Sequence, residues 1–324
     1  MSKPVLLSTG VMMPLVVEQL ERTFETHWLQ KAADRAKLIA DVGPRVDAIC
    51  TGAHTFVRTD AAMMAQMPKL KVIGNFGVGY DSIDVADAAQ RGIVITNTPD
   101  VLNEEVADTA IGLLLATIRE FPQAEAYLRA GRWATEGDYR LTPASLRDRT
   151  VGMIGYGRIG KAIARRLEAF GVRIAYFGRH KQPDVAYPFY DDLVAMARDV
   201  DTLIAILPGG PATLNLVGAD VFKALGPRGI FINMARGTVC DEAALKDALR
   251  SGAILSAGLD VYVNEPKIDP DLMTVPNLMM LPHVGSASEH TRGKMGQLMV
   301  DNLVCFAHRK PPITPVPETP FKGW

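Results

Sequence analysis

The sequence predicts an α/β protein with two doubly wound domains, each built on a parallel sheet. Its 324 residues exceed the length of an average domain. Short apolar segments alternate with helical patterns along most of the chain, and glycine-rich turns join them. One such turn, Gly155–Gly160, has the spacing G-x-G-x-x-G between a strand pattern and a helix pattern.

The first part of the chain is predicted to be a strand-and-helix series without that glycine spacing. Apolar residues recur at helical intervals from Val16 to Trp28, and Asp60 is placed to cap a helix that Pro68 closes. The expected strands are 5–10, 47–52, 70–76 and 93–97, and the expected helices are 15–29, 61–67 and 85–90.

Residues 104–130 have a long helical pattern, in which Pro122 is expected to start a second helix. A long helix with two apolar faces suits an interdomain connector or a subunit interface equally well. The second series then has expected strands 151–154, 172–177, 201–207, 229–233 and 254–260, and helices 161–170 and 241–250.

A last helix, 289–308, lies beyond this series, and we expect it to return to the first domain. The predicted domains are therefore a discontinuous substrate-binding domain, 1–101 with 287–324, and a dinucleotide-binding domain, 102–286.

Each glycine of the turn has a separate physical role in binding a dinucleotide. Gly155 allows the tight turn, Gly157 lets the backbone approach a pyrophosphate, and Gly160 lets the helix pack on the strand. The phosphate charge would then lie at the helix N-terminus, where free N–H groups and the helix dipole favour an anion.

The next strand pattern indicates which dinucleotide is bound. Folds of this kind usually place a carboxylate there to hold the ribose hydroxyls, but here Arg179, His180 and Lys181 follow the strand. Cationic side chains attract a 2′-phosphate, whereas a carboxylate would repel it. We therefore predict NADP(H) as the preferred cofactor, with NAD(H) possible; a solvated basic turn is the alternative interpretation.

Three further residues are candidates for the chemistry. Arg236 follows an expected parallel strand, where an arginine can hold a carboxylate and polarise the carbonyl beside it. His283 can donate a proton near neutral pH, and a carboxylate such as Glu265 would favour its protonated form. Taken singly, His283 also fits an ordinary loop histidine, and Glu265 a surface turn residue.

Several motifs together carry a family resemblance. They are Asn75–Asp84, the Gly155 fingerprint, Asn233–Gly237, Gly258–Pro266 and Leu281–Ser286. In this order they resemble the D-isomer-specific 2-hydroxyacid dehydrogenases, and residues 176–181 look most like the NADPH-dependent glyoxylate/hydroxypyruvate and hydroxyphenylpyruvate reductases.

The resemblance implies a Rossmann-type nucleotide domain and a flavodoxin-like substrate domain with the active site in the cleft, and it implies roles for individual residues. Arg236 would bind the carboxylate and keto oxygen of the substrate, His283 would be the general acid, and Glu265 would orient it. The backbone N–H groups of Val78 and Gly79 would also bind the carboxylate. The implied cofactor contacts are Thr109, Gly155, Gly157, Arg158, Ile159, Gly160, Arg179, His180, Lys181, Leu207, Pro208, Thr213, Met234, Ala235, Asp260, Gly285 and Ser286.

The function that the resemblance implies is NADPH-dependent reduction of glyoxylate or hydroxypyruvate to a D-2-hydroxy acid. One alternative is a larger 2-keto acid, such as hydroxyphenylpyruvate or a 2-ketoaldonate. Another is a dinucleotide-sensing protein similar to the transcriptional corepressors that resemble this family. The family also implies a homodimer.

Composition and charge narrow the partners. The formal net charge is −1, and no basic run indicates nucleic acid as a partner. No apolar run approaches the length of a membrane span, and no secretory signal is visible, so a cytoplasmic location is expected. Cys50, Cys240 and Cys305 are scattered, and nothing in the sequence predicts a metal site.

Overall fold

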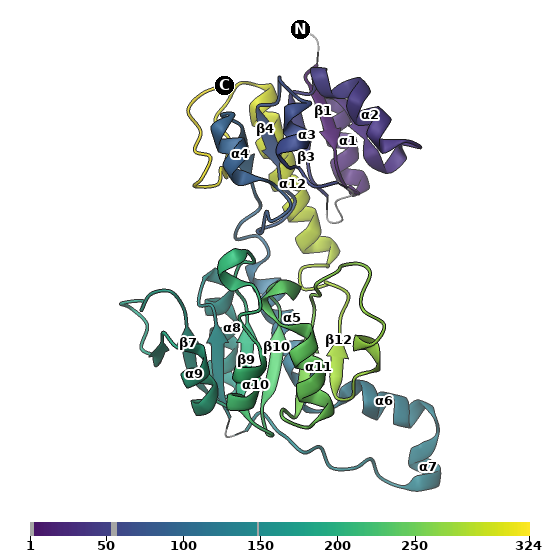
Figure 1. Cartoon of the computed structure of the whole chain (residues 1–324). Helices are drawn as coiled ribbons and strands as arrows, with labels where there is room; N and C mark the ends of the chain where they lie inside the picture. The colour runs from purple at the N-terminus through teal and green to yellow at the C-terminus, as the bar shows by residue number, and fades with distance from the viewer. Residues whose placement is uncertain (1–2, 53–56, 148) are drawn as a thin grey trace. The chain divides into compact units, whose positions relative to one another are not determined.

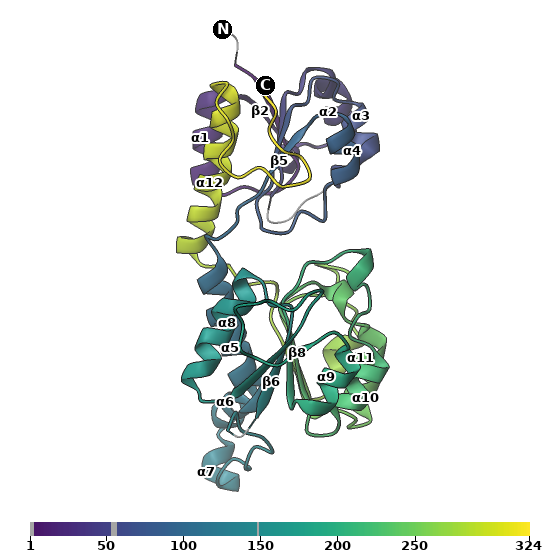
Figure 2. The same ribbon diagram turned by 90° about the vertical axis from the view of Figure 1, so that its left-hand side faces the viewer.

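The computed structural model describes residues 3–52, 57–147 and 149–324. The chain forms two compact units (Figures 1 and 2). The first unit comprises Met1–Leu102 together with Glu289–Trp324, and the second comprises Asn103–Ser288.

The first unit is built on a five-stranded parallel sheet with the order β2-β1-β3-β4-β5. This is the flavodoxin-like order, the fold that the family resemblance implied for this domain. Helices α1 and α12 cover one face of the sheet, and α2, α3 and α4 cover the other (Figure 2). The strands are β1 (Val5–Ser8), β2 (Glu25–Trp28), β3 (Ala48–Cys50), β4 (Val72–Gly74) and β5 (Val94–Thr96); the helices are α1 (Pro14–Thr23), α2 (Arg35–Val42), α3 (Ala61–Ala65), α4 (Val85–Gln90) and α12 (Glu289–Ala307).

One element of this unit corrects the sequence prediction. The helix expected over residues 15–29 ends at Thr23, and Glu25–Trp28 forms the edge strand β2, which pairs with β1. Phe24 and Trp28 are four residues apart and both are buried, so their spacing imitated a helical face. The strand is short and carries polar residues, as edge strands often do.

The second unit is built on a seven-stranded parallel sheet with the order β12-β11-β10-β9-β6-β7-β8. The predicted Rossmann-type arrangement is confirmed: the chain proceeds from β6 to β7 and β8 in one direction, and from β9 to β12 in the other. The strands are β6 (Thr150–Ile154), β7 (Arg173–Phe177), β8 (Phe189–Tyr190), β9 (Thr202–Ala205), β10 (Ile230–Asn233), β11 (Ser256–Leu259) and β12 (Leu278–Met280).

Helices cover both faces of this sheet (Figure 2). Helices α5 and α8 pack on one face, and α9, α10 and α11 pack on the other. The buried core between the second group and the sheet includes Phe222, Phe231 and Leu245. The helices are α5 (Asn103–Ile118), α8 (Arg158–Ala169), α9 (Leu193–Asp199), α10 (Ala219–Leu225) and α11 (Glu242–Arg250).

The long helical pattern at 104–130 is divided between two helices. Helix α5 ends at Ile118 and α6 (Phe121–Arg129) follows, with Pro122 in its first turn as predicted. Glu120 lies between them with a φ of 53°, in the left-handed region that cannot continue a right-handed helix. Helices α6 and α7 (Arg132–Glu136) extend away from the sheet of the second unit (Figure 1). No helix of the described residues is long and apolar enough to cross a membrane.

Candidate active site

The predicted residues of the second unit converge on one edge of its sheet. Because all seven strands are parallel, the loops that follow them leave from the same edge. The strand order reverses between β6 and β9, which is where open α/β sheets bind ligands. The loops begin with Gly155 after β6, Gly178 after β7, Ile206 after β9, Met234 after β10, Asp260 after β11 and Leu281 after β12.

The geometry of the glycine turn fits a dinucleotide. Gly155 has a φ of 96°, and a Cβ there would lie 2.7 Å from the carbonyl oxygen of Ile206. A Cβ on Gly160 would lie 2.8 Å from the carbonyl oxygen of Gly155, so both positions exclude a side chain. A Cβ on Gly157 would meet nothing within 4 Å, which leaves that side of the turn open. No side chain caps the N-terminus of α8, so its first N–H groups suit a phosphate.

The turn after β7 carries cationic side chains and no carboxylate. Arg179, His180 and Lys181 are all exposed, so their side chains are accessible to a phosphate group. Glu168, near the end of α8, accepts a hydrogen bond from the Tyr187 hydroxyl group. This end of the sheet therefore favours a phosphorylated ribose over a ribose with free hydroxyls.

The loop after β10 holds Arg236 through its own hydrogen bonds. The buried Asn233 side chain donates to the carbonyl of Arg236 at 3.0 Å and accepts from the Ala235 N–H at 3.0 Å. A Cβ on Gly237 would lie 1.8 Å from the carbonyl carbon of Tyr262, so glycine alone allows this loop to pack against the next one. From this loop, the positive charge of Arg236 helps to lower the pKa of Glu265.

Glu265 and His283 form a direct pair. The Nδ1 atom of His283 lies 2.6 Å from Oε2 of Glu265, and the Tyr262 N–H donates to Oε1 of the same carboxylate at 2.8 Å. Burial would raise the pKa of Glu265, but the hydrogen bond and charge of His283, the Tyr262 N–H and Arg236 together lower it below the ordinary value. The carboxylate is therefore ionised near neutral pH and accepts a proton from Nδ1.

His283 has a strained backbone. Its φ is 54°, in the left-handed region, which is uncommon for residues other than glycine, although histidine adopts it more often than most. Such strain persists where the surrounding structure holds it, and it often marks a functional residue. The side chain is 43% exposed, so the imidazole is available to a ligand while its Nδ1 atom is held.

Asp260 provides that surrounding support, a role that the sequence analysis did not assign to it. Its two carboxylate oxygens accept from the N–H groups of Val284 at 2.7 Å and Gly285 at 2.8 Å, directly after His283. Burial raises the pKa of Asp260, and these N–H groups partly oppose the rise. A Cβ on Gly285 would lie 3.0 Å from the Asp260 carboxylate and 3.1 Å from Met234, so the predicted cofactor residues Met234, Asp260 and Gly285 lie together.

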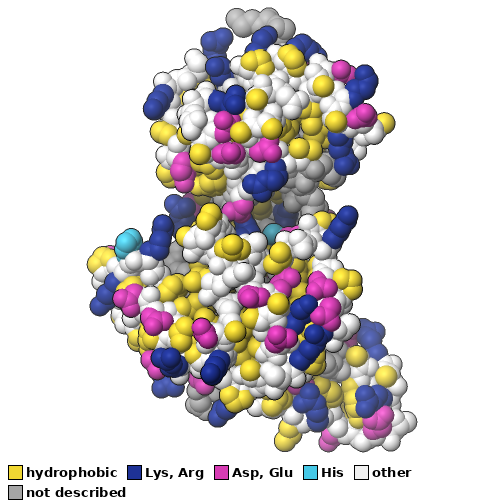
Figure 3. Space-filling model, viewed as in Figure 1, with side chains coloured by type: hydrophobic (Ala, Val, Ile, Leu, Met, Phe, Trp, Pro, Cys, Tyr) yellow, Lys and Arg dark blue, Asp and Glu magenta, His cyan; other side chains and the backbone are white. Residues whose placement is uncertain are grey.

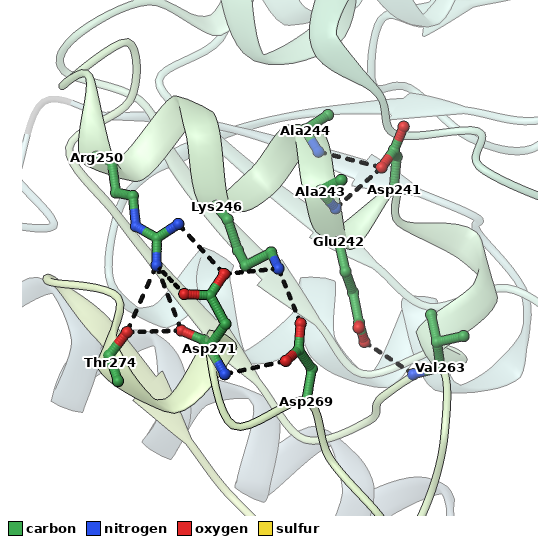
Figure 4. Close-up of polar contacts among 10 residues, drawn as sticks. All are labelled: Asp241, Glu242, Ala243, Ala244, Lys246, Arg250, Val263, Asp269, Asp271 and Thr274. Atoms are coloured by element: carbon green, nitrogen blue, oxygen red, sulfur yellow. Dashed lines mark hydrogen bonds and ion pairs between the residues drawn. The ribbon is translucent and has the colours of Figure 1, made fainter.

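Helix α11 anchors the segment that carries Glu265 (Figure 4). Glu242, in the first turn of α11, accepts from the Val263 N–H at 2.8 Å. Farther along the helix, Lys246 binds Asp269 and Asp271, and Arg250 binds Asp271 at 2.5 Å. The sequence analysis did not identify these contacts, because each joins residues about 20 positions apart without any local motif.

The remaining predicted cofactor residues lie on the same edge or beside it. Thr109, on α5, donates to the carbonyl of Gly285 at 3.1 Å. A Cβ on Gly155 would lie 2.9 Å from Leu207, and the Thr213 hydroxyl group donates to the carbonyl of Pro208 at 2.9 Å. Arg158 and Ile159 begin α8, Ala235 lies beside Arg236, and Ser286 follows Gly285.

Val78 and Gly79 lie in the first unit, within a loop whose carbonyl groups accept hydrogen bonds from asparagine side chains. The Asn75 side chain donates to the carbonyls of Gly77 and Gly79, each at 3.0 Å, and Asn97 donates to the carbonyl of Val78 at 2.9 Å. Within the described part of the chain, no acceptor is recorded for the N–H groups of Val78 and Gly79. Consecutive N–H groups presented in this way bind anions.

Together, the fold and these groups define a dinucleotide-dependent oxidoreductase. The glycine turn fits the cofactor, the His283–Glu265 pair can transfer a proton, and Arg236 can bind an anion. Residues 3–52, 57–147 and 149–324 contain no group of three or more His, Cys, Asp or Glu residues placed to hold a metal ion.

Comparison with known proteins identifies the family. Residues 111–285 match the family model described as D-isomer specific 2-hydroxyacid dehydrogenase, NAD binding domain. The chain belongs to this family, as its motifs indicated, and it is an NAD(P)-dependent 2-hydroxyacid dehydrogenase.

Individual relatives agree with this assignment. The chain is 39% identical over 317 residues to a 2-ketogluconate reductase of Gluconobacter oxydans, covering 97% of this chain and 99% of that protein. It is 42% identical over 257 residues to a glyoxylate/hydroxypyruvate reductase A of Arabidopsis thaliana, covering 79% and 82% of the two chains. The crystal structure of an NADPH-dependent glyoxylate/hydroxypyruvate reductase from Sinorhizobium meliloti, in complex with NADP and malonate, matches with a TM-score of 0.93 and 52% identity over 99% of this chain and 98% of that chain.

Proposed function

We propose that this enzyme uses NADPH to reduce glyoxylate or hydroxypyruvate to the corresponding 2-hydroxy acid, of the D configuration where the product is chiral. The observation that carries the proposal is the arrangement of Arg236 beside the Glu265–His283 pair, on the sheet edge where the glycine turn also lies. A cation and a proton donor beside a dinucleotide site are what reduction of a 2-keto acid requires.

The proton path follows from the Glu265–His283 hydrogen bond. An ionised carboxylate can only accept, so Nδ1 of His283 carries a proton toward Glu265. In the protonated imidazole the Nε2 atom carries the second proton, and it would deliver this proton to the keto oxygen. The Glu265 carboxylate holds the Nδ1 side of the ring, which leaves Nε2 as the nitrogen available to the substrate. Bound NADPH supplies the hydride.

Arg236 would bind the substrate carboxylate and stabilise the negative charge that develops on the keto oxygen. A guanidinium group suits this role because it donates two parallel hydrogen bonds to a carboxylate. The Asn233 contacts hold the arginine's loop in place, so little loop entropy would be lost on binding. The N–H groups of Val78 and Gly79 are a second proposed contact for the carboxylate.

The preference for NADPH is supported by the turn after β7. Arg179 and Lys181 would bind the 2′-phosphate, and His180 lies between them. The Sinorhizobium meliloti protein is described as NADPH-dependent and was crystallised with NADP, and it is 52% identical to this chain. NAD(H) remains a usable second cofactor in this proposal, because the glycine turn binds the pyrophosphate that both cofactors share.

A larger 2-keto acid is the second candidate substrate. It is favoured by the similarity to a 2-ketogluconate reductase at 39% identity and to a hydroxyphenylpyruvate reductase of Plectranthus scutellarioides at 42% identity. All of these substrates share the carboxylate and the neighbouring keto group, so Arg236 and His283 would have the same roles with each.

A substrate panel tests the proposal. Purified enzyme is assayed for oxidation of NADPH and of NADH with glyoxylate, hydroxypyruvate, 2-ketogluconate, hydroxyphenylpyruvate and pyruvate. We expect the highest kcat/KM with NADPH and either glyoxylate or hydroxypyruvate. A highest value with 2-ketogluconate or hydroxyphenylpyruvate would establish the second candidate, and no oxidation with any acid would contradict both.

We also propose that the enzyme is a cytoplasmic homodimer. Hydrophobic side chains reach the surface of the α6–α7 extension (Figure 3, lower right), among them Phe121, Leu128 and Trp133, which are 52%, 56% and 59% exposed. Exposed apolar groups gathered on one extension are typical of an interface. Light scattering during gel filtration should give twice the monomer mass, and replacing Leu128 and Trp133 with Asp should give monomers.

A further inference from the structure

The turn that carries Arg179 and Lys181 has little support of its own. Residues 179–181 are exposed, and so are Pro183 and Asp184 beyond them. Gln182 is the one residue of 179–184 that is partly buried. An exposed turn must be ordered before its side chains can bind a ligand, and the free energy of ordering reduces affinity. The position of Gln182 therefore bears on how well the turn binds a 2′-phosphate.

Gln182 forms two hydrogen bonds that fasten the turn. Its side-chain Nε2 atom donates to the carbonyl of Tyr156 at 2.7 Å, and its backbone N–H donates to the Tyr176 hydroxyl oxygen at 2.8 Å. Tyr156 lies between Gly155 and Gly157 in the fingerprint turn. The first bond thus joins the turn expected to bind the 2′-phosphate directly to the turn expected to bind the pyrophosphate.

Tyr176 supplies a buried hydroxyl group that accepts the hydrogen bond from the Gln182 N–H. It lies on β7 and is fully buried, with its ring 4.9 Å from Tyr156 and 5.3 Å from Phe189 between centroids. A phenylalanine would fill the same core, but only a tyrosine brings an acceptor for the Gln182 N–H. Buried hydroxyl groups normally have such a partner.

The nearby carboxylate of Glu168 has a hydrogen-bond partner within the protein. The Tyr187 hydroxyl group donates a hydrogen bond to Glu168. The rings of Tyr156 and Tyr187 meet edge to face at 5.8 Å. The Tyr187 ring thus contacts the fingerprint turn while its hydroxyl group holds the Glu168 carboxylate.

We propose that Gln182 is a positioning residue for cofactor discrimination: it holds the Arg179–Lys181 turn against the fingerprint turn, so that both cations are placed for a 2′-phosphate. The inference rests on the proposed preference for NADPH. Gln182 itself does not contact the phosphate in this account, and it acts only through the backbone of the turn.

The test measures binding of two fragments of the cofactors, adenosine 2′,5′-bisphosphate and 5′-AMP, by calorimetry. The variants are Gln182→Met, which keeps the length of the side chain and removes its donor, and Tyr176→Phe, which removes the second bond independently. Gln66→Met is a matched control, because Gln66 also donates its amide to a backbone carbonyl, that of Ala62 at 3.3 Å, but in the first unit. Melting temperatures of all four proteins show whether they are folded.

We expect the wild-type enzyme and Gln66→Met to bind the 2′,5′-bisphosphate more tightly than 5′-AMP. In Gln182→Met the affinity for the bisphosphate should fall about tenfold, the effect of losing part of one charge-assisted contact, while the affinity for 5′-AMP changes less than about twofold. Tyr176→Phe should act in the same direction. The ratio of kcat/KM values for NADPH and NADH should fall with the binding ratio.

The outcomes separate this inference from the proposed function. If the wild-type enzyme does not prefer the bisphosphate, the proposed NADPH preference is wrong and the role of Gln182 fails with it. If the wild type prefers it and both folded variants keep the same ratio, only the role of Gln182 is wrong. An equal loss of both ligands in the variants would also overturn it, because Gln182 would then support nucleotide binding in general.

Discussion

The two halves of the sheet edge in the second unit are built differently. On the β10–β12 side, the loops of Arg236, Glu265 and His283 are each held by hydrogen bonds between a side chain and the backbone. On the β6–β7 side, Gln182 fastens the basic turn to the fingerprint turn, but the N-terminus of α8 has no side-chain cap and the basic residues after β7 are exposed. On the first side the hydrogen bonds hold the candidate catalytic loops, and on the second they hold the backbone of a turn whose N–H groups and cations stay open to a ligand.

The difference follows from what each half is proposed to do. Proton transfer requires donor and acceptor atoms to be placed within a few tenths of an ångström, so buried carboxylates such as Asp260 anchor the loops. Phosphate binding requires N–H groups that the protein does not itself use and open space beside them, and a Cβ on Gly157 would meet nothing within 4 Å. Variants on the two sides should therefore fail in different ways, which the following predictions test in order of effect.

Arg236→Ala should cause the largest loss on the β10–β12 side. It removes two charge-assisted hydrogen bonds to the substrate, each contributing about 1.5–3 kcal/mol, so kcat/KM for the keto acid should fall by about a thousandfold. Arg236→Lys should recover part of the loss, because lysine keeps the charge without the bidentate geometry. The affinity for NADPH, measured by fluorescence titration, should be unchanged. A loss of kcat/KM below tenfold would contradict the role of Arg236.

Gly157→Val should cause the largest loss on the β6–β7 side. The new side chain would meet no protein atom but would occupy the approach of the pyrophosphate, so affinity for NADPH and NADH should both fall by at least about tenfold. Gly112→Val on α5 is the control, since a Cβ there also meets nothing within 4 Å. Similar losses in the two variants would mean that Gly157 has no special relation to the cofactor.

Arg179→Ala should have a smaller and more selective effect. Only NADPH carries a 2′-phosphate, so kcat/KM with NADPH should fall about tenfold while that with NADH stays within about twofold. Arg173→Ala, at the other end of β7, removes an exposed arginine from the same strand and should change neither value. An equal fall with both cofactors in Arg179→Ala would contradict the selective role of this turn.

Glu265→Gln should have the smallest of these effects. It should lower the stability of the folded protein by an amount that depends on pH. The pKa of Glu265 is lower in the folded protein than the ordinary value, so its ionised form stabilises the fold above the unfolded pKa of about 4.3. This stabilisation is lost as the pH falls through the folded pKa. Wild-type enzyme should therefore melt a few degrees above the variant at pH 6–7, and the difference should shrink below about pH 4. A difference that grows on acidification would contradict the ionised pair.

The sequence predicted the two halves unequally well. The glycine turn could be located because its residues are contiguous and their spacing has one physical meaning. Arg236, Glu265 and His283 were candidates from their residue types and positions, but only the family resemblance implied their roles, because 18 positions separate Glu265 from His283 and spacing alone cannot show that they meet. The supporting roles of Asp260, Glu242 and Gln182 depend on how loops fold back on one another, so no local pattern contains them.

The fold shows the same limit. Parallel strands with continuous apolar residues, such as β6 and β10, were predicted nearly to the residue. The edge strand β2, which carries polar residues, was assigned to a helix, and β8 and β12 were not predicted because they contain only 2 and 3 residues. Each of these strands is defined by its pairing with a neighbouring strand, β1, β7 or β11, and a local sequence pattern does not show that pairing.

The most direct test of the division between the two halves is made on one variant, His283→Ala. NADPH affinity is measured by fluorescence titration, and turnover of glyoxylate or hydroxypyruvate is measured on the same preparation. We predict an affinity within about twofold of wild type and a kcat lower by roughly a thousandfold, because only the general acid is lost. A turnover number near that of wild type, or a loss of NADPH binding as large as the loss of turnover, would contradict this division of roles between the two halves.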